Sequence, residues 1–147
     1  MRQSEDLRVF PISKTGGNPT RIMLDAQDMS RADMIAVTKT FGHECGFVFP
    51  AEAIGAANYR FRYFVPGHEM EMCGHATIGA LWAMRDRGLL RSSDLIIDTL
   101  SGLVKANVPA SGSIAISQPR AKITLLTDAQ VEAVRHVLGI GRGDLLR

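Results

Sequence analysis

The residues best suited to chemistry lie in two short segments of the chain. The first is His43-Glu44-Cys45, which directly precedes an apolar run at residues 46–49. A carboxyl group beside such a run would be poorly solvated, and burial disfavours its charged form, so we expect the pKa of Glu44 to rise toward neutrality. A general acid or base works best when its pKa is near the working pH. Glu44 is therefore the candidate proton-transfer residue, with an exposed loop glutamate or a helix cap as the alternative.

The second segment is Cys73-Gly74-His75-Ala76-Thr77, at the predicted start of a helix. The first N–H groups of a helix have no intrahelical partner, and the helix dipole favours an anion beside them. Gly74 would let a ligand approach the backbone closely. The segment therefore predicts a site for a substrate carboxylate. The alternative is a small buried cysteine, a glycine turn and a histidine that is hydrogen-bonded within the core.

Neither a metal nor a nucleotide cofactor is expected. The possible metal ligands are His43, Glu44, Cys45, His68, Cys73 and His75. Three adjacent residues rarely point at one ion, and the chain has no C-x-x-C or H-x-x-x-H pair. Gly16-Gly17 is too short for a phosphate-binding loop, and neither a Walker pattern nor G-x-G-x-x-G occurs.

Composition narrows the class of protein. The 147 residues fit one domain, and 46% hydrophobic with 22% charged residues is ordinary for a globular protein. The net charge is +2 and the basic residues are scattered, which favours a small-molecule partner over nucleic acid. The longest apolar run, residues 76–84, is too short to cross a bilayer. The polar N-terminus and only two cysteines favour a cytoplasmic location and no membrane.

Hydrophobic periodicity predicts a chain that mixes strands and helices. Strands are expected at residues 7–12, 21–24, 46–49, 59–65, 69–72, 95–99, 103–108 and 114–117. A helix should begin at Ser30, with Asp33 completing a capping box, and end at Gly42. A last helix should begin at Thr127, with Gln130 in the matching position, and end near residues 138–139.

The helix expected from Cys73 to about Gly88 is apolar or small at nearly every position up to residue 84. A helix that is apolar all round lies inside a structure, not on its surface. We therefore predict an α/β fold of the α+β type, in which a β-barrel-like sheet wraps around this central apolar helix.

Several motifs, in this order, resemble the PhzF-like family of phenazine-biosynthesis-type isomerases. The resembling pieces are Gly17-Asn18-Pro19, His43-Glu44-Cys45-Gly46-Phe47, Tyr59-Arg60-Phe61-Arg62-Tyr63-Phe64 and Met72-Cys73-Gly74-His75-Ala76-Thr77-Ile78-Gly79-Ala80. The resemblance implies one half of the diaminopimelate-epimerase-like fold, with the active site in a cleft between two such halves. By resemblance, residues 1–139 are the N-terminal domain, and residues 140–147 begin a linker toward an absent second domain.

The resemblance also implies roles for individual residues. The family's acid/base glutamate falls on Glu44, its active-site histidine on His75, and the asparagine of its early motif on Asn18. In the phenazine pathway the family member isomerises trans-2,3-dihydro-3-hydroxyanthranilate without a metal or a cofactor. His43 replaces a serine that is common in the family, which would change the hydrogen bonding of Glu44.

These observations predict a cofactor-independent isomerase that moves a proton at carbon of a small carboxylate-bearing substrate. Glu44 is the expected catalytic residue, and the expected substrate-binding residues are Asn18, His43, Gly74, His75, Ala76 and Thr77. Family members are about twice as long by resemblance, so we expect a homodimer or pairing with a second-half chain. Two alternatives stay open: a racemase or epimerase that uses Cys73 as a thiol base, and a non-catalytic binding or assembly module.

Overall fold

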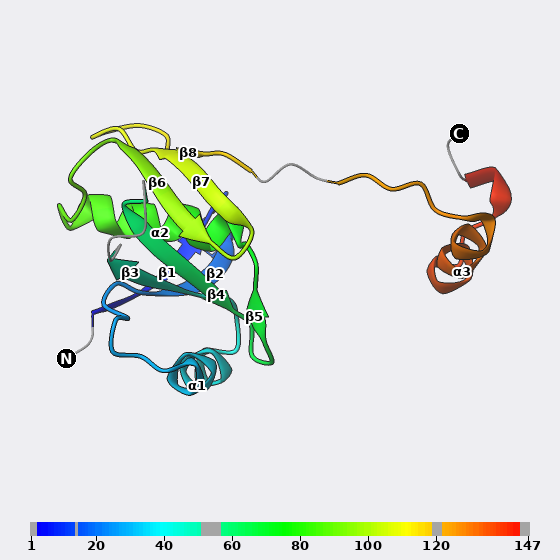
Figure 1. Cartoon of the computed structure of the whole chain (residues 1–147), viewed down its shortest axis with the longest axis horizontal. Coiled ribbons are helices and arrows are strands. Elements are labelled where there is room, and N and C mark those ends of the chain that lie inside the picture. Colours follow the sequence, from blue (N-terminus) through cyan, green and yellow to red (C-terminus); the bar gives the residue numbers. More distant parts are fainter. Residues whose placement is uncertain (1–2, 14, 51–56, 119–121, 145–147) are drawn as a thin grey trace.

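A computed structural model describes residues 3–13, 15–50, 57–118 and 122–144 of the chain. One curled sheet wraps around helix α2 (Gly74–Asp86), as Figure 1 shows. The strands are β1 (Ser4–Val9), β2 (Asn18–Met23), β3 (Cys45–Pro50), β4 (Tyr59–Phe64), β5 (Glu69–Met70), β6 (Asp94–Thr99), β7 (Gly102–Asn107) and β8 (Ala115–Ile116). Their order is β1-β2-β3-β4-β6-β7-β8, and β5 pairs with β4. The predicted α+β half-barrel around a central helix is confirmed.

Strand β4 shows how the sequence pattern sets the two faces of the sheet. Phe61 and Tyr63 are each 1% exposed and belong to the core around α2. The intervening Arg60 and Arg62 lie on the other face, where they pair with Asp98 and Glu69. Successive side chains of a strand point to opposite faces, so the alternation predicted from the sequence is confirmed.

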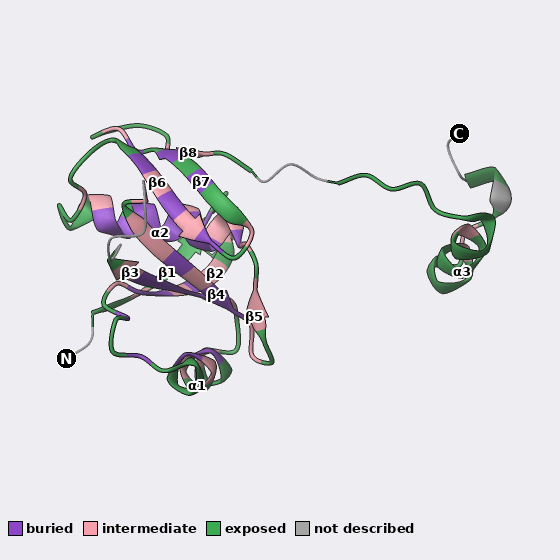
Figure 2. Ribbon diagram, in the orientation of Figure 1, coloured by how far each residue is buried: buried purple, intermediate pink, exposed green. Residues whose placement is uncertain are grey.

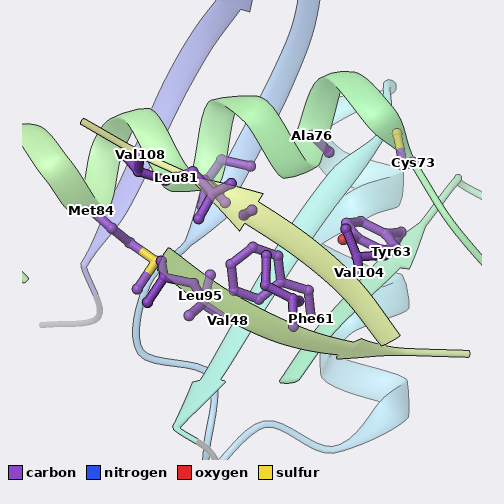
Figure 3. Packing of buried hydrophobic residues seen from close by; sticks show 14 residues of the cluster. Val48, Phe61, Tyr63, Cys73, Ala76, Leu81, Met84, Leu95, Val104 and Val108 are labelled. Atoms are coloured by element: carbon purple, nitrogen blue, oxygen red, sulfur yellow. The ribbon is translucent and has the colours of Figure 1, made fainter. Parts of the chain in front are cut away.

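Helix α2 is the centre of the larger core, as predicted. Seven of its residues are buried, and they form one broad side of the helix: Ala76, Thr77, Gly79, Ala80, Leu81, Ala83 and Met84. Figure 3 shows Leu81 and Met84 packed toward Val48, Phe61 and Leu95 of the surrounding strands. The sheet leaves the opposite side of the helix less covered, and Trp82 on that side is 42% exposed.

Helix α1 (Arg31–Phe41) covers the other face of the sheet, where it contacts β3 and β4. Ser30 accepts a hydrogen bond from the Asp33 N–H, and the Asp33 carboxylate accepts one from the Ser30 N–H. Gly42 ends the helix with φ of 82°, which glycine adopts without strain. Both predicted ends of α1 are confirmed.

Helix α3 (Asp128–Leu138) forms with the predicted capping box between Thr127 and Gln130, and a short 3₁₀ turn (Arg142–Asp144) follows it. None of its residues is buried, and Figure 2 shows most of the helix as exposed. The side chains of Val134, Val137 and Leu138 are therefore left without a packed core.

The largest differences from the predicted strand boundaries are in β1 and β2, and both lie near the candidate site. The strand predicted at residues 7–12 is β1, Ser4–Val9, because Phe10 takes a left-handed φ of 57° that cannot continue a strand. The strand predicted at residues 21–24 already begins at Asn18. Asn18 therefore lies in a strand, opposite Val9.

Candidate active site

Glu44 directly precedes strand β3 and is held there by the parallel neighbour β2. Its carbonyl oxygen accepts hydrogen bonds from the Thr20 hydroxyl (3.0 Å) and the Arg21 N–H (3.4 Å). In β3, Cys45 packs with the core beneath α1, whereas Val48 packs with the core around α2. Because side chains alternate, Glu44 shares the α2 face. The residue is half-buried.

The first turn of α2 lies against the same end of β3. A Cβ added to Gly46 would lie 3.6 Å from the Ala76 Cβ and only 2.9 Å from the Ile22 Cδ1. The absence of a side chain at Gly46 thus allows the helix to approach the strand. Glu44 lies two residues before Gly46 on the same face of β3, so its side chain is on the side of the strand that the first turn of α2 approaches. The structure therefore brings the segment with Glu44 close to the segment that begins α2 at Cys73.

Cys73 is the N-cap of α2 and is 5% exposed. Figure 3 shows it at the start of the helix. Burial raises the pKa of the Cys73 thiol, and the charge of Glu44 raises it further, while the N–H groups of Ala76 and His75 act in the opposite direction. The net effect favours the protonated thiol. The Cys73 sulfur also lies 3.5 Å from the His75 Nδ1.

His75 is half-buried, and its Nε2 is buried without a hydrogen-bond partner among the described residues. A buried imidazole nitrogen without a partner is costly unless a ligand or water completes it. This nitrogen is therefore an available donor or acceptor at the start of α2.

Thr77 fixes the start of the helix. Its hydroxyl donates to the Cys73 carbonyl oxygen (2.7 Å) and also lies 2.7 Å from the Tyr63 hydroxyl. Its N–H donates to the same carbonyl (3.0 Å). Burial raises the pKa of Tyr63, so this hydroxyl stays protonated and can donate to Thr77. The polar groups of Thr77 are thus engaged within the protein, and Ala76 is fully buried against the sheet.

Asn18 and His43 lie on different sides of the sheet. Asn18 is exposed and shares its strand face with Thr20, whose Cγ2 lies 3.3 Å from the Cβ position of Gly79 in α2. The ring of His43 contacts the ring of Phe41 at the end of α1, with 5.8 Å between the ring centres. The structure therefore places Asn18 on the α2 face with Glu44, and His43 on the α1 side.

Gln118 lies at the candidate site, although the sequence did not predict it. Its side-chain amide nitrogen lies 3.5 Å from the Cβ position of Gly74, so it covers the first residue of α2. Gln118 follows β8, more than 40 residues after Gly74 along the chain. Nothing in its local spacing connects it to the helix start. Its position directly after the strand predicted at residues 114–117 was the one sequence feature that could have indicated it.

The described part of the chain contains no group of three or more His, Cys, Asp or Glu residues that could hold a metal ion. Within the same residues, no helix is long and apolar enough to cross a membrane.

The fold is shared with a known class of protein. A Bacillus anthracis phenazine biosynthesis protein of the PhzF family superposes with a TM-score of 0.65 and 36% identity, over 71% of this chain and 34% of that one. A hydroxyproline epimerase from Agrobacterium vitis shares the fold at 14% identity, with a TM-score of 0.53 over 80% of this chain and 40% of that one. The half-barrel around α2 is thus the fold of epimerase- and racemase-like proteins.

The family model "Phenazine biosynthesis-like protein" matches residues 7–139, and the chain belongs to this family. "Uncharacterized isomerase YfhB" of Bacillus subtilis is 33% identical over 112 residues, which are 74% of this chain and 37% of that protein. "Antisense-enhancing sequence 1" of Schizosaccharomyces pombe is 29% identical over 143 residues, which are 92% of this chain and 48% of that protein. The chain thus spans less than half the length of these curated relatives.

Proposed function

We propose that this chain supplies one wall of the active site of a cofactor-independent isomerase, with Glu44 as the general acid/base. The observation that carries the proposal is the position of Glu44 on the α2 face of the sheet, at the end of β3 that the first turn of α2 approaches. Membership of a family whose relatives are named isomerases supports the reaction class.

In the proposed reaction, the Glu44 carboxylate removes a proton from a carbon next to an electron-withdrawing group of the substrate. The C–H electron pair moves into the adjacent π system, and the proton returns from Glu44 to another carbon of that system. No electron acceptor or metal is required, because the product is an isomer of the substrate. A fixed carboxylate and preorganised donors are what such a transfer needs.

Three groups around the start of α2 are suited to holding the substrate's polar groups. The first N–H groups of α2 have no intrahelical partner, and the Cys73 side chain makes no capping hydrogen bond to them. The His75 Nε2 is unpartnered among the described residues, and the Gln118 amide lies over Gly74. Together with the positive end of the helix dipole, these donors favour a small substrate that bears a carboxylate.

The test is hydrogen exchange at the substrate carbon in D₂O. A panel of small carboxylates with an activated C–H bond is incubated with the chain, and deuterium incorporation is followed by NMR. Glu44→Gln should abolish incorporation while the fold is retained, because the amide cannot accept the proton. Glu132→Gln, on the exposed helix α3, is the matched control and should leave the rate unchanged. A fully active Glu44→Gln variant would refute the proposal.

A second candidate is a thiol-based racemase or epimerase with Cys73 as the base. The contact between the Cys73 sulfur and the His75 Nδ1, together with the position of the thiol at a helix N-terminus, favours it. The raised pKa of Cys73 argues against it, because the thiol is then protonated at neutral pH. This reaction would also need a second base from an opposing wall. Loss of exchange in Cys73→Ala with full exchange in Glu44→Gln would favour this candidate.

A further inference from the structure

Strand β5 connects the sheet to the start of α2. It is only two residues long, Glu69–Met70, and it pairs antiparallel with the end of β4. Two further residues separate it from Cys73, the N-cap of α2 (Figure 1). A segment this short spans at most about 10 Å, so the position of β5 determines where α2 begins.

The main-chain pairing of β5 is limited, because most strands are about 5–6 residues long and β5 has far fewer ladder positions. Arg62 of β4 adds a side-chain contact. Its Nε donates to Oε1 of Glu69 (2.6 Å), and its Nη2 donates to Oε2 (2.7 Å). Two parallel bonds between a guanidinium group and a carboxylate are among the stronger hydrogen bonds in proteins. The side chain of Glu69 is only 12% exposed, so water screens this pair less than a surface pair.

The guanidinium group of Arg62 is also held from below. It lies over the ring of Phe64, 5.3 Å from the ring centre, and Phe64 is itself fully buried. A guanidinium group that is already oriented loses less freedom when it binds a carboxylate. Arg31, the first residue of α1, lies 3.8 Å from the Glu69 carboxylate, but its side chain is 59% exposed. Arg62 is therefore the main partner of Glu69.

Strand β4 supports the start of α2 from both of its faces. Tyr63 points away from Arg62, toward α2, and its hydroxyl lies 2.7 Å from the Thr77 hydroxyl in the first turn of the helix. Arg62 acts on the other face, through Glu69 and the chain that leads into the helix. The first contact holds a side chain of the helix, and the second holds the main chain that enters it.

We propose that Arg62 and Glu69 are positioning residues, whose ion pair holds β5 against β4 and thereby fixes the segment from Cys73 to Thr77 relative to Glu44. Neither side chain would touch the substrate, because both lie on the α1 face of the sheet with Phe64. A displacement of about 1 Å can cost a reaction about 100-fold in rate. The effect on proton transfer rests on the proposed function, whereas the effect on the start of α2 does not.

The first test measures how often the start of α2 opens, by alkylation of thiols with iodoacetamide. Cys73 and Cys45 are the only cysteines of the chain, and they are 5% and 0% exposed. Each thiol reacts only when its surroundings open, and mass spectrometry of the peptides gives the two rates separately. Glu69→Gln should raise the Cys73 rate at least about tenfold, as expected for the loss of a hydrogen bond to a charged group, with little change at Cys45. Equal acceleration of both thiols would indicate a loosened fold and would overturn the proposal.

Asp6→Asn is the matched control. Asp6 binds Arg21 through the same two-bond geometry, at 2.6 and 2.7 Å, but this pair joins β1 to β2. The substitution should leave the Cys73 rate unchanged. Arg62→Met should act like Glu69→Gln, and Arg62→Lys, which keeps the charge, should give a rate between those of Arg62→Met and the unchanged protein. An unchanged Cys73 rate in Glu69→Gln, or an equal increase in Asp6→Asn, would refute the proposal.

The second test uses deuterium exchange into the substrate. Glu69→Gln should lower the exchange rate at saturating substrate by about tenfold or more, and Arg62→Lys should retain more of the rate than Arg62→Met. Faster alkylation of Cys73 with a full exchange rate would show that the pair does not position the reaction, and would overturn that part. If the unchanged protein exchanges none of the substrates, the proposed function fails, while alkylation still decides whether the ion pair holds the start of α2.

Discussion

The buried hydroxyl pair of Tyr63 and Thr77 gives a quantitative test of how the start of α2 is held. Both side chains are almost completely buried, and their oxygens lie 2.7 Å apart. The Thr77 hydroxyl also donates to the Cys73 carbonyl oxygen. The Tyr63 hydroxyl therefore acts as the donor to Thr77, and it has no access to water if Thr77 is replaced.

The free energy of unfolding should respond unequally to the two substitutions. Tyr63→Phe removes one hydrogen bond and leaves Thr77 with its Cys73 partner, so it should cost about 1 kcal/mol. Thr77→Val removes the bond to Cys73 and also leaves the Tyr63 hydroxyl buried and unpaired, so it should cost about 2–3 kcal/mol. The Cys73 carbonyl keeps the Thr77 N–H as a partner.

The double variant is decisive, because it has no unpaired hydroxyl. Its cost should be about 1 kcal/mol below the sum of the two single costs. Urea unfolding, followed by circular dichroism and Trp82 emission, measures all four proteins. Strict additivity, or a larger cost for Tyr63→Phe than for Thr77→Val, would show that the hydroxyls are not coupled as described.

Other predictions concern packing, titration and capping. Gly79→Val should destabilise the fold by about 1–3 kcal/mol in urea unfolding, because a Cβ there already lies 3.2–3.4 Å from three side chains, whereas Gly67→Ala, in open space, should change stability by less than about 0.5 kcal/mol. Burial raises the pKa of both Cys45 and Cys73, so their contribution to stability is complete below the ordinary thiol pKa of about 8.5 and is lost as the pH rises through the higher folded values. Unfolding free energy should therefore fall between pH 7 and 9.5, and a variant with alanine at both positions should show a flatter profile. Ser30→Ala should cost about 1 kcal/mol by loss of the α1 cap, and equal stability of this variant would contradict the capping box.

Local rules were sufficient for most of the fold. The alternation of arginines and aromatics in β4 follows from one buried sheet face, and the caps at Ser30 and Thr127 follow from side-chain oxygens that bond nearby N–H groups. The all-round apolar α2 had to lie inside the sheet. Strand order and the parallel pairing of β2 with β3 depend on contacts between distant residues, and no local pattern encodes them.

The candidate site was predictable in part. The proximity of Glu44 to the start of α2 was expected from the family resemblance. In the structure, α2 can approach β3 there because Gly46 has no side chain. The position of His43 on the α1 side follows from the strand alternation that begins at Cys45. Gln118 could not be predicted, because the curl of the sheet brings β8 back to α2.

The most direct test of the central claim compares two variants in one exchange experiment. Glu44→Gln and Cys73→Ala are incubated in D₂O with a small carboxylate that the unchanged protein exchanges, and the rate of deuterium incorporation at carbon is measured by NMR. The account predicts that exchange disappears in Glu44→Gln and persists in Cys73→Ala, since the carboxylate moves the proton and the buried thiol does not. Exchange that persists in Glu44→Gln and disappears in Cys73→Ala would contradict it.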